Sequence, residues 1–441
     1  MDYKKIKAHL STAIKNVSSN ISQYTVNPGK DLTRTKKLPP DKLITFMISE
    51  GSSSTKNELL DFFDMDVQTP TVSAFNQQRE KLKPEALEAV FRQFNSLVNS
   101  DRDIKDYNYI AADGSSFTFF SKASFASSDY YISEGHSAKG YYSMHLNAFF
   151  DLKRHVYTDA VIQPVHQKDE YSAFCEMVDR YEALPDEKAV FIGDRGYCSY
   201  NNMAHAINKG HFFLFRTKDI HSKGLVGNFD FPETDSFDIT VTVTLVRSAS
   251  KKIQPAEGYT RFIDKATSFD FIVYGSKDTV ELSFRVVRFP LSDNTYECVV
   301  TNLPSDGFPA ERIKSVYFLR WGIESSFRKL KYTIGLINFH AYKPEYIKQE
   351  IWAKLISYNL TETVVNNTVV SKKQRKYDYI VNFSMAAHIC GTFLRPAKKN
   401  DSIVVSSLLQ KELVPIRDER QYKRLSTAHF RKPRYFIYRA A

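Results

Sequence analysis

The sequence predicts a mixed α/β protein in which a helical region precedes a sheet-based core. Apolar residues recur at helical spacing over roughly the first hundred residues, and from Tyr107 onward short apolar runs alternate with helical segments. Beyond residue 219, apolar and polar residues alternate with a period of two, which is typical of β-strands with one exposed face. We therefore expect an all-helical region, an α/β core and a β-rich insertion within that core.

The helical region is expected to consist of short amphipathic helices joined by turns. Helices are predicted to begin near Leu43 and Asn57, and two more are predicted over residues 71–82 and 85–94. The helix over 71–82 carries side chains of the kinds that read base edges in a DNA major groove. We expect its exposed DNA-contacting residues to be Gln77, Gln78 and Arg79. A plain surface helix is the alternative interpretation of this segment.

The α/β core shows three predicted strands followed by helix, strand, helix and strand. The second and third strands form a hairpin that turns near Lys153-Arg154. Two strands are each predicted to end on an aspartate, Asp113 for the first and Asp194 for the fourth. Carboxylates at the ends of neighbouring strands are candidates for a shared site.

The β-rich insertion is predicted to begin near residue 219. Residues 239–246 alternate strictly, and further strand is predicted over 260–275 and 281–289. A last strand leads to Pro309, which opens a helix because proline is well tolerated in the first helical turn.

That helix contains the stretch Tyr317–Lys331, read as Y-F-L-R-W-G-I-E-S-S-F-R-K-L-K. In a continuous helix of about 100° per residue, four of its polar side chains fall within a sector of about 60° beside the apolar stripe. These residues are Tyr317, Arg320, Glu324 and Lys331. An ordinary amphipathic helix with a solvated charged face is the alternative for this stretch taken alone.

The chain is strongly basic, with a net charge of +11 and a sequence pI near 9.1. This charge favours an acidic polymer as partner, although a merely basic protein has the same composition. The basic run at 371–376 and the basic residues of the last thirty positions are predicted phosphate contacts. No signal peptide and no apolar segment of about 20 residues is present, so we expect no membrane partner and a cytoplasmic location.

The cysteines and histidines predict no zinc site. Cys175, Cys198, Cys298 and Cys390 are far apart and form no C-x-x-C pair, so they are interpreted as buried thiols in a reducing compartment. Four histidines follow Asp113 without zinc-ligand spacing, and ordinary core or surface roles are expected for them. They are His136, His145, His155 and His166.

Asp113, Asp194 and Glu324 together suggest a site for divalent metal ions. Three carboxylates can hold two ions such as Mg²⁺ about 4 Å apart, which suits in-line attack on a phosphodiester. Arg320, Lys331 and Tyr317 would then grip the flanking phosphates. The set points to a nuclease or a strand-transfer enzyme.

These motifs resemble the DDE transposases of the insertion-sequence-four type. The resemblance rests on D-G-S at 113, D-R-G-Y at 194 and the spacing Y-x2-R-x3-E-x6-K from Tyr317 to Lys331, and it spans about residues 60–440. It implies an RNase H-like core with a β insertion, and two Mg²⁺ or Mn²⁺ ions per active site. It also implies a homodimer on two transposon ends, with cut-and-paste chemistry through hairpin-closed ends.

The resemblance assigns roles residue by residue. Asp113, Asp194 and Glu324 are implied to ligate metal and to be catalytic. The resemblance implies that Tyr317, Arg320 and Lys331 contact terminal DNA. Further expected contacts with double-stranded DNA, at the terminal repeats or the target, are Trp321, Arg328 and Arg195. The better-known members stack a tryptophan of the insertion on a flipped base. This insertion has none, and Phe231, Phe237, Tyr259 or Phe262 could supply the ring instead.

The combined prediction is a bacterial, nucleoid-associated transposase with five segments. They are a helical DNA-binding domain (1–104), a first core part (105–218), a β insertion (219–290), a second core part with the catalytic helix (291–400) and a basic C-terminal segment (401–441). Two alternatives remain: a catalytically inactive, transposase-derived DNA-binding protein, and a host nuclease on the same core.

Overall fold

The computed structural model describes residues 1–34, 37–100, 107–134, 138–227, 229–248, 259–292, 295–370, 377–396 and 402–416. The chain divides into two compact units. The first, called the helical unit, comprises Met1–Arg102, Phe117–Met144 and Phe327–Ala441. The second, called the sheet unit, comprises Asp103–Ser116 and His145–Ser326. Within the described stretches, no helix combines the length and apolar character needed to cross a membrane.

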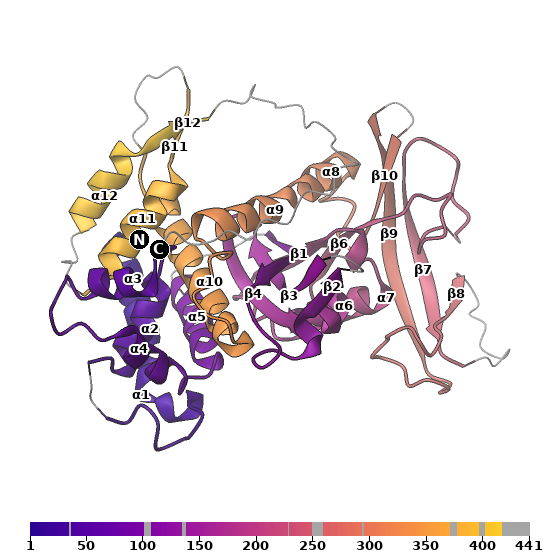
Figure 1. The fold of residues 1–441 in the computed structure, drawn as a ribbon. Coiled ribbons are helices and arrows are strands. Elements are labelled where there is room, and N and C mark those ends of the chain that lie inside the picture. Colours follow the sequence, from indigo (N-terminus) through magenta and orange to yellow (C-terminus); the bar gives the residue numbers. More distant parts are fainter. Residues whose placement is uncertain are drawn as a thin grey trace. The chain divides into compact units, whose positions relative to one another are not determined.

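A ten-stranded mixed sheet carries the α/β core, and its strand order is β2-β3-β1-β5-β6-β10-β9-β7-β8, with β4 paired to β3 (Figure 1). The central strands β1, β5 and β6 run parallel, whereas β10 is antiparallel to β6 and to β9. The predicted mixed α/β fold is confirmed, but four strands, β1 to β4, precede the first core helix instead of the predicted three, because residues 131–134 form β2, which pairs with β3. The strands are β1 (Tyr107–Phe119), β2 (Tyr131–Glu134), β3 (Ala138–Asp151), β4 (Val156–Pro164), β5 (Lys188–Gly193), β6 (Phe212–Thr217), β7 (Phe237–Val246), β8 (Tyr259–Phe262), β9 (Thr279–Ser292) and β10 (Thr295–Thr301).

Helices α6 (Glu170–Asp179) and α7 (Tyr200–Asn208) are the crossovers between β4 and β6, and they pack on the sheet. Phe174 of α6 anchors this layer, because its ring centroid lies 5.5 Å from those of Phe149 and Phe215. The strand beneath, β5, is buried along five consecutive residues, as expected for a parallel strand covered on both faces.

The predicted insertion extends the central sheet. Strand β9 pairs with β10, β7 pairs with β9 over ten residues, and β8 adds to β7 in parallel. The prediction of strand over 260–275 is wrong beyond Phe262. From Asp264 to Ile272 the chain instead folds around the buried guanidinium of Arg247, which donates hydrogen bonds to the carbonyls of Asp264, Thr267, Phe269 and Ile272.

The helical unit is built around α10 (Pro344–Asn366), which is buried along most of its length. Helices α1, α2, α5 and α11 pack on it, so helices from both ends of the chain share one unit (Figure 1). The helical character of the first hundred residues is confirmed; the predicted domain boundaries stay predictions. The remaining elements are α1 (Tyr3–Ser19), α2 (Pro40–Ser49), α3 (Thr55–Phe62), α4 (Val72–Arg79), α5 (Glu85–Asn99), α11 (Phe383–Leu394), α12 (Ser402–Lys411), β11 (Tyr379–Val381) and β12 (Leu413–Pro415).

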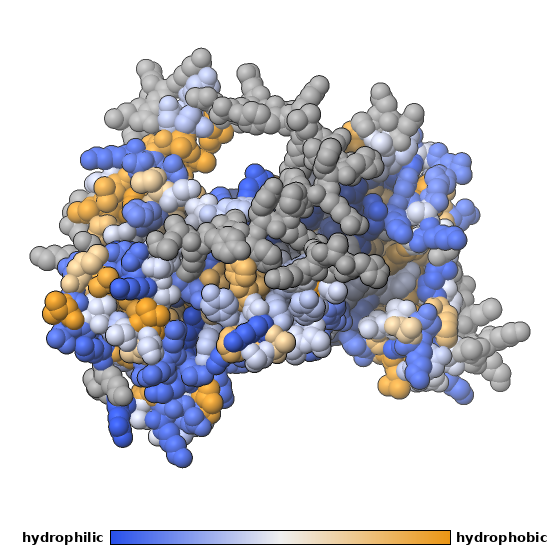
Figure 2. All heavy atoms as spheres, viewed as in Figure 1, coloured by the Kyte–Doolittle hydropathy of each residue, from blue (hydrophilic) through white to orange (hydrophobic). Residues whose placement is uncertain are grey.

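Polar side chains cover most of the face seen in Figure 2, and apolar residues appear there only in small groups. The exposed large apolar side chains include Val404 and Leu408 of α12 and Ile380 of β11. The basic run at 371–376 and the predicted basic tail lie outside the described residues. The same holds for the tail's Arg417, Arg420, Lys423, Arg424, Arg431, Lys432, Arg434 and Arg439.

Arg79 is buried, which corrects the prediction that it is an exposed DNA contact. Arg79 is 1% exposed, and its Nη1 lies 2.9 Å from Oε1 of Glu350 on α10. Its Nε and Nη2 donate to Gln349 Oε1 and the Tyr346 carbonyl. Arg79 follows Phe75 by four residues, so both occupy the inner face of α4.

A second buried ionic group surrounds His340. Its Nδ1 lies 3.5 Å from Oε2 of Glu350 and 3.9 Å from Oε1 of Glu50, and its Nε2 lies 3.7 Å from Oε1 of Glu58. Burial alone would lower the pKa of His340. The charge of Glu50 and hydrogen bonds with Glu350 and Glu58 outweigh burial and raise the pKa to about 9.

We predict that Arg79→Ala destabilises the protein, because it removes the guanidinium that pairs with the buried Glu350 and leaves this carboxylate to His340 alone. Loss of one partner of a buried pair costs roughly 3–5 kcal/mol, which urea unfolding would measure. The control is Gln77→Ala on the exposed face of the same helix, for which we expect a change within about 0.5 kcal/mol. Equal effects of the two substitutions would contradict the structural role of Arg79.

We also predict a pH-dependent effect of His340→Gln. The pKa of His340 is raised from 6.5 to about 9, so its stabilising charge is fully present below pH 6.5 and is lost as pH rises through about 9. The variant should therefore be less stable than the wild type by roughly 1–3 kcal/mol near pH 6 and nearly equal to it near pH 10. A difference in unfolding free energy that does not vary with pH would contradict this assignment.

Candidate active site

The pairing of two parallel strands places Asp113 and Asp194 side by side. Strand β1 pairs with β5 in a register that ends at Ala112↔Gly193. Each aspartate is the next residue along its own strand direction. Because parallel strands in register end at the same edge, the two carboxylates emerge at one point of the sheet.

Asp113 does not end its strand, which corrects one detail of the prediction. Strand β1 continues to Phe119, and what ends at Asp113 is the pairing with β5. The Asp113 side chain is half-buried, and its Oδ1 accepts a hydrogen bond from the Gly114 N–H at 2.8 Å.

Asp194 immediately follows β5 and caps the short 3-10 turn Arg195–Tyr197. Its Oδ1 accepts from the Gly196 N–H at 2.7 Å, as an N-cap side chain does. Gly193 is required before it, because a Cβ at this position would lie 2.7 Å from the Cβ of Tyr197. The turn thus holds the Asp194 carboxylate at the edge of the sheet.

The helix that carries Glu324 is broken, so the predicted continuous helix from Tyr317 to Lys331 is wrong. Helix α8 (Ala310–Phe318) ends before α9 (Trp321–Arg328), and a π-helical turn follows at Lys329–Thr333. Between α8 and α9 the backbone tightens into i to i−3 hydrogen bonds, from the N–H of Arg320 to Tyr317 O and of Ile323 to Arg320 O. The sector of about 60°, which assumes a continuous ideal helix, therefore does not describe the four polar side chains from Tyr317 to Lys331.

Glu324 lies on α9, where one contact holds its side chain and a second holds the helix on the sheet. Arg320 Nη2 donates to Glu324 Oε1 at 2.9 Å, and the arginine side chain is 8% exposed whereas that of Glu324 is 38% exposed. The hydroxyls of Tyr157 on β4 and Ser326 lie 2.8 Å apart and fix the helix on the sheet. A Cβ at Gly322 would lie 2.9 Å from Leu152 Cδ2, so a larger residue there would make that leucine side chain shift.

The three carboxylates affect one another electrostatically. Burial, and to a smaller degree the negative charges of Asp194 and Glu324, raise the pKa of Asp113 to about 6. The Gly114 N–H and the charge of Arg320 lower the pKa of Asp113, but by less than burial and the two carboxylates raise it. Three carboxylates thus act on one another at this edge of the sheet, an arrangement that suits a bound metal cation.

Sequence reasoning missed a polar group beside Asp113. His145 Nε2 lies 3.0 Å from Glu170 Oε1, and His145 Nδ1 lies 2.9 Å from the Ser116 hydroxyl. The hydrogen bond with His145 is the main cause that lowers the pKa of Glu170 to about 2. A Cβ at Gly114 would lie 2.3 Å from His145 Nε2, so only glycine fits there. No local motif points to Glu170.

The remaining predicted residues differ in exposure. Tyr317 and Arg320 are buried, and the Arg320 guanidinium lies 5.1 Å from the ring centroid of Trp321, which is 48% exposed. Arg195, Arg328 and Gln77 are exposed, and Gln78 and Lys331 are half-exposed. Arg328 and Lys331 belong to the helical unit.

The four candidate stacking rings also differ in exposure. Phe231 is buried, Phe237 and Tyr259 are half-buried, and Phe262 is 51% exposed.

Comparison with known proteins supplies the family. A family model described as "Transposase DDE domain" matches residues 105–360. The putative transposase InsL for insertion sequence element IS186A of Escherichia coli K12 is 36% identical over 67 residues, which are 15% of this chain and 18% of that protein. The transposase InsG for insertion sequence element IS4 of the same organism is 29% identical over 90 residues, 20% of each chain. The matched stretches thus span about a fifth of these curated relatives.

A solved structure of a piggyBac transposase synaptic complex with hairpin DNA aligns with 94% of this chain and 86% of the piggyBac chain. The sequence identity is 9% and the TM-score is 0.43. The family model, by contrast, spans 256 of the 441 residues and contains all three carboxylates. The resemblance noted in the motifs is confirmed. The chain belongs to the transposase DDE domain family.

Proposed function

We propose that this protein is a transposase that cuts and rejoins DNA at the ends of an insertion sequence. One observation carries the proposal. The register of β1 and β5 sets Asp113 beside Asp194, and Glu324 is close enough to raise the pKa of Asp113 together with Asp194. Such a carboxylate group is the arrangement that metal-dependent phosphodiester chemistry requires.

The donor set fits hard divalent ions. Asp113, Asp194 and Glu324 offer only carboxylate oxygens, which Mg²⁺ and Mn²⁺ prefer. We propose that they hold two such ions per active site. Bound there, divalent ions supply Lewis-acid activation of the attacking oxygen and charge stabilisation at the leaving oxygen.

The chain's own residues orient this site and the DNA. Arg320 holds Glu324 by an ion pair at 2.9 Å. Arg320 would also contact a DNA phosphate; among the described residues its buried Nε has no hydrogen-bond partner, and the side chain would have to move for a phosphate to reach it. Arg195, next to Asp194, and Trp321 are exposed and would contact the flanking nucleotides. Among the candidate rings of the insertion, Phe262 is the most exposed and the best placed to stack on a base.

DNA contacts outside the sheet unit are also proposed. Gln77 and Gln78 remain candidates for base contacts on α4, and Lys331, Arg328 and the basic segments remain candidates for phosphate contacts.

Tyr317 is buried, so its role would be to support Arg320, whose guanidinium lies 5.9 Å from the centroid of the tyrosine ring. Assembly as a homodimer on two terminal repeats, and a cytoplasmic, nucleoid-associated location, belong to the same proposal.

Two other functions are weighed against this one. An inactive DNA-binding relative need not retain all three carboxylates together with Tyr317, Arg320 and Lys331, and this chain retains them all. A host nuclease would use the same site but would release cut ends without joining them. A joining assay with a target plasmid separates the nuclease from the transposase, because only the transposase yields insertions.

We predict that Glu324→Gln abolishes Mg²⁺-dependent cleavage of a duplex carrying the element's terminal repeat. The substitution keeps the size of the side chain and removes the charge that would hold the cation, so the cleavage rate should fall by orders of magnitude while DNA binding stays nearly unchanged. Gel-based cleavage and binding assays on the same duplex measure both.

The matched control is Glu311→Gln, which makes the same change at an exposed position of α8. It should cleave like the wild type. If Glu324→Gln lost binding together with cleavage, Glu324 would be structural. If the wild type bound but never cut, the inactive relative would be favoured.

We also predict that Lys331→Ala weakens binding to the terminal repeat and lowers the salt dependence of binding. Loss of one phosphate contact should reduce the slope of log K against log salt by about one. Lys209→Ala, an exposed lysine at the end of α7, serves as control and should leave the slope unchanged. An unchanged slope in Lys331→Ala would remove this residue from the DNA interface.

A further inference from the structure

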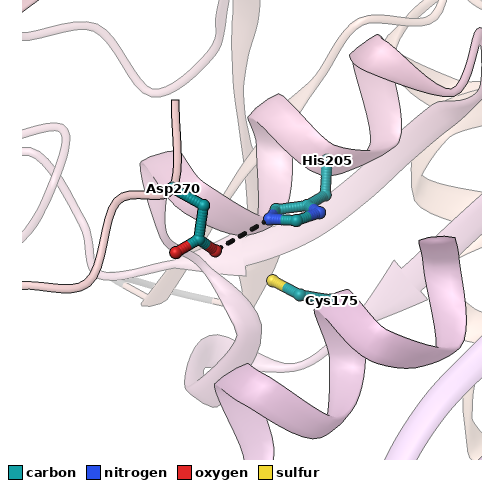
Figure 3. A group of neighbouring side chains, drawn as sticks. All are labelled: Cys175, His205 and Asp270. Atoms are coloured by element: carbon teal, nitrogen blue, oxygen red, sulfur yellow. Dashed lines mark hydrogen bonds and ion pairs between the residues drawn. The ribbon is translucent and has the colours of Figure 1, made fainter. Parts of the chain in front are cut away.

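Three side chains of different chemistry meet in the sheet unit, at a place separate from the carboxylate site. Figure 3 shows Cys175 of α6, His205 of α7 and Asp270 of the insertion pointing toward one another. One ligand atom from each, a sulfur, a ring nitrogen and a carboxylate oxygen, lies within 4.8 Å of the other two. His205 Nε2 is 3.0 Å from Oδ2 of Asp270.

The imidazole of His205 is oriented from behind by a fourth residue. Its Nδ1 lies 2.8 Å from Oδ1 of Asp179, at the end of α6. Histidines that ligate a metal through one nitrogen almost always donate the other N–H to a carboxylate or a carbonyl. With a metal ion bound at Nε2, Asp179 would accept the Nδ1–H and hold the tautomer whose Nε2 lone pair faces the cluster.

The thiol lies in a pocket that favours a cation. Cys175 is buried, and its Sγ is 3.3 Å from Asn202 Oδ1 and 3.6 Å from Asn201 Nδ2. Burial, and to a smaller degree the carboxylates of Asp270 and Asp179, raise the pKa of the Cys175 thiol to about 12. A bound metal ion would reverse this balance, since a coordinating thiol gives up its proton.

The segment that brings Asp270 to the cluster is held in place independently. The Arg247 guanidinium donates to the carbonyls of Phe269 and Ile272, on either side of Asp270. Asn201 contacts Asp270 twice, with its Nδ2 donating to Oδ2 at 2.8 Å and its Oδ1 accepting from the Asp270 N–H at 3.0 Å. The carboxylate thus faces α6 and α7 without a large loss of entropy on binding an ion.

We propose that Cys175, His205 and Asp270 bind a Zn²⁺ ion, with Asp179 as the residue that orients His205. Thiolate, imidazole and carboxylate are the three ligand types of zinc sites, whereas Mg²⁺ rarely accepts the first two. The side chain of Asp270 is 60% exposed, which leaves a fourth position on the solvent side for water. The ion would tie the β-rich insertion to the two crossover helices of the core.

This proposal revises the expectation that the cysteines form no zinc site. That expectation rested on local spacing, and here His205 and Asp270 are separated by 65 residues. The site does not depend on the proposed transposase activity, because its ligands differ from Asp113, Asp194 and Glu324. Its role would be structural, in fixing the insertion.

The test is metal content and Co²⁺ spectroscopy of the full-length protein. After chelation and reloading with Zn²⁺, the wild type should retain about one equivalent. Co²⁺ in its place should give a thiolate-to-cobalt charge-transfer band in the near ultraviolet, absent in Cys175→Ser and retained in Cys298→Ser, a second buried cysteine. Asp179→Asn should weaken Zn²⁺ binding by roughly 10–100-fold.

If Cys175→Ser does not fold, Asp270→Asn tests the zinc site instead. Asp270 is exposed, so this substitution should leave the circular dichroism spectrum unchanged. It should lose Zn²⁺ affinity, while the exposed control Asp278→Asn should not. Asp194→Asn should keep its zinc, which separates this site from the carboxylate site. Wild-type protein that takes up no zinc, or Co²⁺ bound without the thiolate band, would overturn the proposal.

Discussion

The parallel pairing of β1 with β5 is the constraint on which the rest of the candidate site depends. Its register ends at Ala112↔Gly193, so Asp113 and Asp194 leave the ladder together at one edge of the sheet. Each is then held by a backbone N–H, that of Gly114 or of Gly196. Helix α9 supplies the third carboxylate through the Arg320–Glu324 pair. A shift of one residue in the register would turn one aspartate to the opposite face and dismantle the group.

Buried polar contacts position the elements within each of the two units. Arg247 shapes the segment after β8 by binding four carbonyls, and Arg285 reaches from β9 to Asp238 on β7 and to the carbonyls of Leu303 and Phe308. In the helical unit Arg79 and His340 bridge acidic residues of separate helices. Such groups add specificity more than stability, because desolvation offsets most of their attraction. In the sheet unit, the contacts of Arg247 and Arg285 explain how a sheet with a long insertion keeps one register.

Much of the fold follows from local patterns, and less of the site does. Strand and helix alternation predicted the core and the insertion, because periodicity reports burial directly. Spacing and motif singled out Asp113, Asp194 and Glu324, whose roles stay predictions. The break between α8 and α9 was not predictable from an apolar stripe that continues through it. Arg79 was misjudged although its spacing from Phe75 placed it on the inner face. Glu170 and the group of Cys175, His205 and Asp270 are joined only by tertiary packing.

The central claim is that Asp113, Asp194 and Glu324 share one cation site, and iron-directed cleavage of the polypeptide tests it most directly. Fe²⁺ replaces Mg²⁺ at carboxylate sites, and with ascorbate and peroxide it generates radicals that cut the backbone nearby. In protein freed of other divalent ions, we expect cuts close to residues 113, 194 and 324 in one sample. Excess Mg²⁺ should suppress all three cuts, and Asp194→Asn should lose them together. Cuts near only one of these residues, or a pattern unchanged in Asp194→Asn, would contradict a shared site.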